Sequence, residues 1–200
     1  MSEENDMRAL LLALAATACL AAAAPAFGQS VGMKSTPNIN LAGFSGDVHS
    51  LPTAVSNIEK LSGGRVAEIR YHNVGGVPGY DVALAQGDHM RFQRFTKAGN
   101  KPVELAESKT PAWMLDWRGQ KNMSLVHGAK VPLADAIRTA EASMKGAPAV
   151  AAGILHGAAD PSTAVHAYNV SVLKNGSQHR VAVNSDSGAL IANPQTLPGW

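Results

Sequence analysis

A repeated pattern of residues limits the fold of this 200-residue protein more than any other feature of its sequence. Each copy starts with a short apolar stripe near a proline, continues through a glutamate to a tyrosine, and reaches a turn glycine with an arginine four residues beyond it. The corresponding residues are Pro52 and Pro132, Glu59 and Glu141, Tyr80 and Tyr168, Gly87 and Gly176, and Arg91 and Arg180. Self-similarity of this kind indicates one supersecondary unit that occurs twice.

The second copy predicts a helix followed by three strands. Pro132 suits the first turn of a helix because it has no amide hydrogen to leave unpaired, and Gly146 ends the helical spacing of apolar residues. The expected strands cover 149–155, 165–173 and 179–184, and Lys174, Asn175 and Gly176 predict a hairpin between the last two. Within these two strands apolar residues alternate with polar ones, which is typical of a sheet with one buried face.

The first copy predicts the same elements over a shorter length. Its helical stripe ends at Gly63, a strand begins at Val66, and 80–85 and 89–95 form a hairpin. We therefore expect an α+β fold with two repeated modules, each a helix packed on a small antiparallel β-sheet, and we expect the two modules to pack against each other. The expected organisation is a signal peptide at 1–28, a flexible mature N-terminus at 29–46, module 1 at 47–100, a connector at 101–128 and module 2 at 129–200.

The first 28 residues have the composition of a secretory signal peptide. Arg8 supplies a positive charge, residues 9–24 are almost entirely alanine and leucine, and small residues precede a cleavage site between Gly28 and Gln29. The apolar run is shorter than the roughly 20 residues that a membrane-spanning helix needs. The sequence therefore predicts export to the periplasm or secretion, with no stable membrane span after cleavage.

Three alternatives stay open at this end of the protein. The apolar run could remain as a membrane anchor, Cys19 could carry a lipid, and translation could begin at Met7 instead of Met1. Cys19 is the only cysteine, so cleavage after Gly28 would leave a mature protein with no disulfide and no thiol ligand or nucleophile.

The second copy resembles the PepSY domain. The residues that carry the resemblance are Ala134 to Glu141, Tyr168 to Val172, and Val181 to Leu190. The first copy matches through Tyr80 to Leu84 but has Lys97-Ala98-Gly99 where the family has an acidic turn. The resemblance implies a noncatalytic module that restrains peptidases or serves as a sensory or binding domain, and it implies no shared catalytic residues.

The stretch Asn184-Ser185-Asp186-Ser187-Gly188 has a composition that suits either a catalytic loop or a tight turn. This stretch contains no Gly-x-Ser-x-Gly sequence, and His179 stands at the opposite end of the preceding strand. We therefore predict a turn in which asparagine and aspartate side chains bind backbone amides and Gly188 adopts a positive φ.

Metal and partner sites give weaker signals. The seven histidines show no metal-binding spacing, so we expect dispersed residues, no metal site and no cofactor; they are His49, His72, His89, His127, His156, His166 and His179. Trp113 and Trp117 would share one face of a short helix, either as a partner-binding surface or as a filling between the modules.

These observations predict an exported, noncatalytic binding or regulatory protein whose partner is a protein of the cell envelope, such as a peptidase or a sensor. The alternative is a periplasmic protein that binds a small ligand or a metal through dispersed histidines and aromatic residues. A hydrolase built from Asp, Glu, Ser and His is the third and lowest-ranked hypothesis. We expect that the protein is not an enzyme. Scattered basic residues and a net charge of +2 argue against nucleic acid as a partner.

Overall fold

The computed structural model describes residues 41, 44, 50–74, 76–98, 101–111, 117–155, 166–194 and 197. The predicted signal peptide, most of the expected flexible N-terminus and Trp113 lie outside these residues. The described elements are α2 (Leu51–Ser62), β1 (Arg65–Val74), β2 (Val77–Gln86), β3 (His89–Ala98), β4 (Lys101–Pro111), α3 (Trp117–Gly128), α4 (Leu133–Ser143), β5 (Ala149–Ile154), β6 (Ala167–Lys174) and β7 (Ser177–Asn184). No helix among the described residues is long and apolar enough to cross a membrane.

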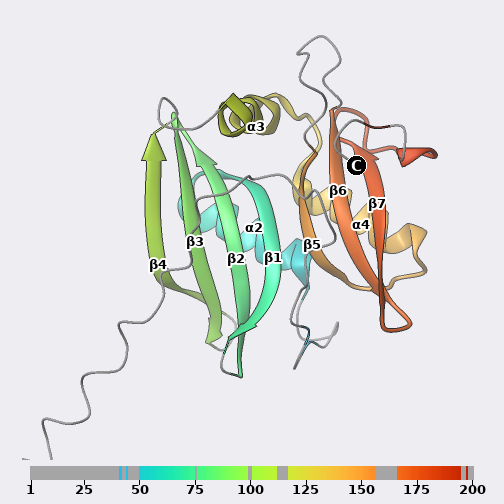
Figure 1. Ribbon diagram of the computed structural model, residues 1–200, viewed down its shortest axis with the longest axis horizontal. Helices are drawn as coiled ribbons and strands as arrows, with labels where there is room; N and C mark the ends of the chain where they lie inside the picture. The colour runs from blue at the N-terminus through green and yellow to red at the C-terminus, as the bar shows by residue number, and fades with distance from the viewer. Residues whose placement is uncertain are drawn as a thin grey trace, which may run out of the picture.

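The named strands form one continuous antiparallel sheet of seven strands in the order β4-β3-β2-β1-β5-β6-β7 (Figure 1). The prediction of two repeated modules, each with its own small sheet, is therefore wrong. The finding that overturns it is the pairing of β1 with β5, in which Glu68, Ile69 and Arg70 lie opposite Gly153, Ala152 and Ala151. An edge strand exposes unpaired N–H and C=O groups, and this pairing satisfies two such edges at once.

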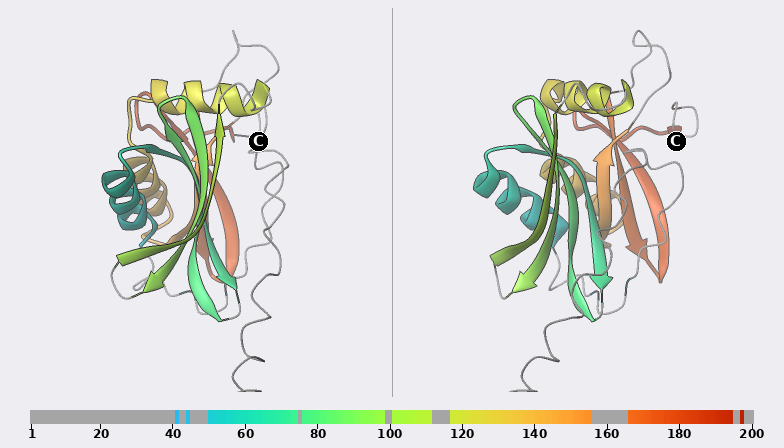
Figure 2. Two further views of the ribbon diagram at one scale, coloured as in Figure 1. Left: turned by 90° about the vertical axis from the view of Figure 1, so that its left-hand side faces the viewer. Right: turned by 60° about the vertical axis from the view of Figure 1, so that its left-hand side comes forward.

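Helices α2 and α4 lie next to each other on one face of this sheet (Figure 2). The apolar stripe of α2 is buried at Leu51, Val55 and Ile58, and α4 buries Leu133, Ala136, Ile137 and Ala140. Gly63 ends α2 with φ 68°, and its amide donates to the Glu59 carbonyl at 2.9 Å. The predicted helix positions and the end of α2 at Gly63 are confirmed, whereas α4 ends at Ser143 with Met144 as its C-cap, before the predicted Gly146.

The core lies between the two helices and the sheet. Alternate residues of the strands point toward the helices and are buried, among them Ile69, Tyr71, Val82, Leu84, Tyr168, Val170, Val172 and Val183. Phe44 packs edge-on against Tyr71, with 5.0 Å between the ring centroids. The apolar residues of the predicted alternation face the core as expected, but β6 is buried on both faces from Ala167 to Val172, so the expected single buried face is wrong for this strand.

Residues 101–128, which we expected to connect the modules, contribute the edge strand β4 and helix α3. Helix α3 crosses one end of the sheet (Figure 2) and buries Met123, Leu125 and Val126. Arg65 at the start of β1 donates to the Ala129 carbonyl at 2.9 Å. This hydrogen bond ties the end of α3 to the centre of the sheet.

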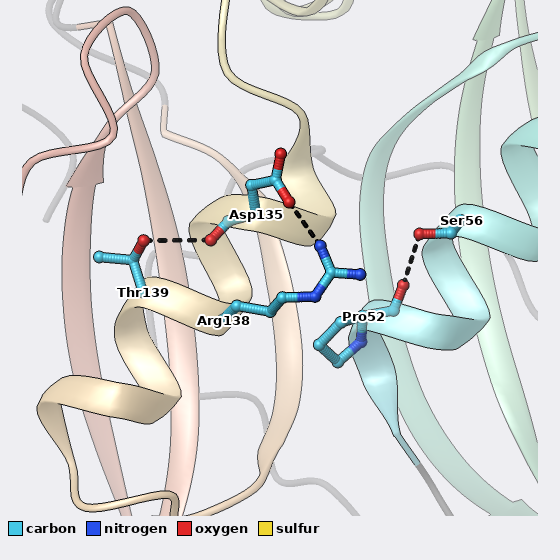
Figure 3. A network of polar contacts seen from close by, with 5 residues as sticks. All are labelled: Pro52, Ser56, Asp135, Arg138 and Thr139. Carbon is cyan, nitrogen blue, oxygen red and sulfur yellow. Dashed lines mark hydrogen bonds and ion pairs between the residues drawn. The ribbon is translucent and has the colours of Figure 1, made fainter.

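The outer surface of α2 and α4 satisfies its polar groups locally. Ser56 donates to the Pro52 carbonyl at 3.0 Å, Thr139 donates to the Asp135 carbonyl at 3.1 Å, and Arg138 pairs with the Asp135 carboxylate (Figure 3). Pairs of this kind within one exposed helix contribute only a few tenths of a kcal/mol. Asn169 and Ser171, whose buried side chains each have a polar atom with no hydrogen bond, lie on the other side of the sheet.

Candidate functional site: a polar sheet face

The face of the sheet opposite α2 and α4 carries a concentration of polar side chains that we call the polar face. It comprises Glu68, Arg70 and His72 of β1, Asp81 of β2, Arg94 of β3, Asn169 and Ser171 of β6, and Arg180 of β7. Side chains alternate between the two faces of a strand, and these residues are out of phase with the buried Ile69, Tyr71, Val82 and Val170. The strand register aligns Arg94, Asp81, Arg70, Ala151, Ser171 and Arg180 in one row across six strands.

Ion pairs neutralise the part of the polar face on β1, β2 and β3. Arg94 Nε donates to Asp81 Oδ1 at 2.8 Å, and His72 Nδ1 lies 3.4 Å from the same oxygen. Burial alone would raise the pKa of Asp81, but contacts with His72 and Arg94 outweigh this effect and hold the pKa below its usual value. Glu68 pairs with Arg70 in the same way. Both carboxylates of the polar face are thus matched by arginines.

The part on β6 and β7 is different because it contains donors and no carboxylate. Asn169 is 1% exposed and Ser171 is fully buried. Arg180 Nε donates to Asn169 Oδ1 at 3.4 Å, which leaves the amide nitrogen of Asn169 directed elsewhere. Among the described residues, Asn169 Nδ2 and Ser171 Oγ have no hydrogen-bond partner. Burial lowers the pKa of Arg180, but an arginine remains charged at neutral pH.

Small residues separate the two parts. Strand β5 contributes Ala151 and Gly153 to this face, opposite Arg70 and Glu68 on β1. A Cβ atom on Gly153 would lie 3.1 Å from Glu68 Cγ, so the side chain of Glu68 lies over this glycine. Gly79 likewise leaves room for the side chain of His72. A Cβ atom added to Gly79 would lie 2.9 Å from His72 Nε2 and 2.1 Å from the Phe95 carbonyl oxygen. Glycines therefore give the long polar side chains room on this face.

The stretch from Asn184 to Gly188 forms the predicted turn. Asn184 Oδ1 accepts hydrogen bonds from the backbone amides of Asp186 and Ser187, both at 2.9 Å, and Gly188 has φ 74°. Contrary to the prediction, the Asp186 carboxylate accepts no backbone amide of a described residue, and it lies 3.3 Å from His166 Nδ1. The carbonyl of Ser185 accepts the amides of residues 130 and 131 just before α4. The turn thus holds the start of α4 against the end of β7.

The other predicted site residues are only partly described. Trp117 begins α3, its side chain is not described, and Trp113 lies outside the described residues, so their predicted partner-binding role stays a prediction. Of the histidines, His72 faces Asp81, His89 faces Asp88, and His166 faces Asp186. Within the described part of the protein, no group of three or more His, Cys, Asp or Glu residues could hold a metal ion.

The sequence interpretation missed the polar face. The signal was present as polar residues at alternate positions, Glu68-x-Arg70-x-His72 and Asn169-x-Ser171. Such alternation usually indicates a solvated face, and it gave no sign that Asn169 and Ser171 would be buried. As described, this surface supplies hydrogen-bond donors and charges for binding. Among the described residues, Ser171 Oγ has no hydrogen-bond partner.

No protein-family model matches this sequence, and no curated protein matches it. Among solved structures, it is similar to a candidate lipoprotein from Clostridium difficile 630, with 12% sequence identity and a TM-score of 0.40. The alignment covers 67% of this protein and 84% of that one. A likeness of this size adds no argument about the function of this protein.

Proposed function

We propose that this protein is an exported, noncatalytic binding protein that contacts a protein partner in the cell envelope through its polar face. The observation that carries the proposal is the row of charged and polar side chains across six strands, which includes the buried donors Asn169 and Ser171. Buried polar groups in proteins are nearly always hydrogen-bonded, and an unpaired one costs about 1–3 kcal/mol. Arg70, Asp81 and Arg94 are partly exposed, and they are the members of this row that a polar partner can contact.

Two features of the sequence support the location and the class of partner. The apolar segment before Gln29 has the composition of a signal peptide, which supports export. The stretches around Tyr168 and Gly188 resemble the PepSY domain, which supports a regulatory role toward a peptidase or an envelope sensor. We take the partner to be a protein because the polar face extends over strands from both halves of the sequence, an extent that suits a macromolecule.

Site-specific photo-crosslinking tests this proposal. A photoreactive amino acid replaces Arg70 on the polar face or, as the matched control, Thr139 on the outer surface of α4. Each variant is expressed in the organism that encodes the protein, and the envelope fraction is irradiated. We expect a discrete crosslinked protein from position 70 and none from position 139, with both variants melting within a few degrees of the unmodified protein.

Two outcomes would contradict the proposal. Equal crosslinking from both positions would indicate nonspecific contact, and crosslinking from position 139 alone would place the partner on the helices. A crosslinked product at position 70 would be identified by mass spectrometry, which would distinguish a peptidase from a sensor.

A further inference from the structure

Strand β4 lies at one edge of the seven-stranded sheet (Figure 1). One side of its backbone pairs with β3, and no described strand lies on its other side. The N–H and C=O groups on the outer side of an edge strand are a template for pairing with another protein molecule. The outer side of β4 is therefore the place where a second copy of this chain would extend the sheet.

The register shows which residues of β4 direct their backbone groups outward. His89 pairs with Gln86 across a two-residue hairpin, so its N–H and C=O groups point toward β2. This direction alternates along a strand, so the backbone groups of Met90 point toward β4, where its partner is Thr110. The next residue of β4, Pro111, therefore directs its backbone away from β3.

Pro102 has the same orientation at the other end of β4. The backbone groups of Ala98, like those of Met90, point toward β4, and the partner of Ala98 is Lys101. Pro102 follows Lys101, so its backbone points outward. Proline has no amide hydrogen. Both ends of the outer edge of β4 thus lack the donor that any other residue would present there.

A bulge interrupts the middle of the same edge. The register of β3 and β4 shifts between Arg94 and Phe95, which leaves Leu105 as an extra residue of β4. An extra residue bends a strand and increases its twist, which opposes regular pairing along it. Between the bulge and the end of β4, the outward-facing residues are Glu107 and Lys109, and charged residues on an edge strand also discourage pairing.

The opposite edge of the sheet is partly covered by the chain itself. The amide of Asn184 donates to the Ala189 carbonyl at 2.8 Å, and the amide of Ile191 donates to the Ala182 carbonyl at 3.0 Å. Residues 189–191 thus run along the end of β7. Among the described residues no segment covers β4 in this way, so its protection depends on the residues of the strand itself.

We propose that Pro102 and Pro111 prevent a second copy of this chain from adding its own β4 to the edge of the sheet. The inference goes beyond the proposed function, which concerns the polar face and a different protein. Two β4 strands placed side by side would pair through their outward-facing N–H and C=O groups, and each proline removes one donor from that pairing. Replacing both prolines would restore these donors on each copy.

Sedimentation velocity of the purified protein tests the inference with the double variant Pro102→Thr/Pro111→Thr. Threonine favours strands and restores the amide hydrogen without adding a large apolar side chain. The matched control is Ala106→Thr/Ser108→Thr, which introduces threonine at two positions of β4 whose backbone groups point toward β3. We expect the unmodified protein and the control to be monomers, and the proline variant to have an association constant at least about tenfold higher than theirs.

Amide hydrogen exchange in the associated variant shows which surface is used. We expect slower exchange at Glu107 and Lys109, whose amides point outward from β4, and unchanged exchange at Thr139 on α4. Melting curves establish that each variant is folded. If the threonine variant does not fold, Pro102→Ala/Pro111→Ala restores the same two donors and takes its place.

Four results would overturn the inference. They are a proline variant that stays monomeric, equal association of the control variant, association without slower exchange at Glu107 and Lys109, and an unmodified protein that already associates through β4. All four are measured on the purified protein without any partner. Specific crosslinking from position 70 would therefore still support the proposed function if the inference about β4 failed.

Discussion

Glu59 and Glu141 offer a quantitative test of how each helix is attached to the sheet. Glu59 Oε1 accepts the backbone amide of Val66 at 2.9 Å, and Glu141 Oε1 accepts the amide of Ala149 at 2.8 Å. Each carboxylate thus joins its helix to the beginning of the strand that follows. The changes to make are Glu→Ala and Glu→Gln at both positions.

The alanine variants remove the acceptor and leave the amide of the strand unpaired. An unpaired buried donor costs about 1–3 kcal/mol, and because both glutamates are only half-buried we expect about 1 kcal/mol at each site. For a domain of this size, 1 kcal/mol lowers the melting temperature by about 2–4 °C. The glutamine variants keep a carbonyl acceptor in the same place and should avoid most of this loss.

The glutamine variants should also change how stability depends on pH. Burial raises the pKa of Glu59, partly offset by the Val66 hydrogen bond and by Arg65, and burial likewise raises the pKa of Glu141 against the Ala149 bond and Arg138. A raised pKa means that the folded state holds the proton more tightly than the unfolded state does. The stabilisation from protonated Glu59 and Glu141 is therefore complete below the unfolded pKa, near 4.5, and is lost as pH rises through the folded pKa.

Chemical denaturation between pH 4 and pH 7 measures this effect as the difference between the double glutamine variant and the unmodified protein. Contributions from the histidines are common to both proteins and cancel. As pH rises above about 4.5, the unmodified protein should lose stability that the glutamine variant keeps. We therefore expect the free energy of unfolding of the glutamine variant, minus that of the unmodified protein, to increase over this range. A difference that is independent of pH, or a glutamine variant as unstable as the alanine variant, would refute the reasoning.

Two further pairs of variants test local features. Gly79→Ala would place a Cβ 2.1 Å from the Phe95 carbonyl oxygen and should cost about 1–3 kcal/mol or more in thermal melts, whereas Gly128→Ala, with open space around its Cβ, should leave stability unchanged or raise it. Asn184→Ala removes the acceptor of two turn amides and should cost about 1 kcal/mol. Asp186→Ala removes a half-exposed contact with a histidine and should cost less, and the reverse order would contradict the assignment of the turn.

Local structure was predictable because single residues dictate it. Gly63 ends α2 in the left-handed region, as its position after the apolar stripe predicted. Asn175 and Gly176 adopt positive φ values of 52° and 76° in the hairpin between β6 and β7, which is the conformation that their sequence favours. In both cases the conformational preference of one or two residues decides the outcome.

The joining of the halves was not predictable in the same way. Alternation within a strand specifies which side chains are buried, but it does not specify which neighbouring strand satisfies the backbone groups. β5 is a run of small apolar residues, Ala149 to Ile154, buried along its whole length. This composition suits the centre of a large sheet as well as the first strand of a small one, and only the structure distinguishes them.

The candidate site was missed for the same reason. Glu68 and Asn169 are far apart in the sequence and belong to different halves of the repeat. They become neighbours of Gly153 only because β1 and β6 both pair with β5. Two separate modules would have carried two smaller polar surfaces, so the polar face follows from the joining of β1 to β5.

A double-mutant cycle between Gly153 and Glu68 tests that joining directly. A Cβ on Gly153 would lie 3.1 Å from Glu68 Cγ and 3.2 Å from the Ala67 carbonyl oxygen, so the larger side chain of Gly153→Val should cost about 1–3 kcal/mol by crowding. Glu68→Ala removes Cγ, the nearest of the crowded atoms, and leaves the Ala67 carbonyl oxygen and the Cβ of residue 68 in place. In its presence the cost of Gly153→Val should therefore fall by about 0.5 kcal/mol or more, because contacting residues show coupling of about 0.5–3 kcal/mol. Free energies of unfolding that add within about 0.5 kcal/mol would mean that the two residues are not in contact. Glu68 belongs to β1 and Gly153 to β5, and the two residues lie opposite each other only because these strands pair. Additivity would therefore refute the continuous sheet and with it the polar face.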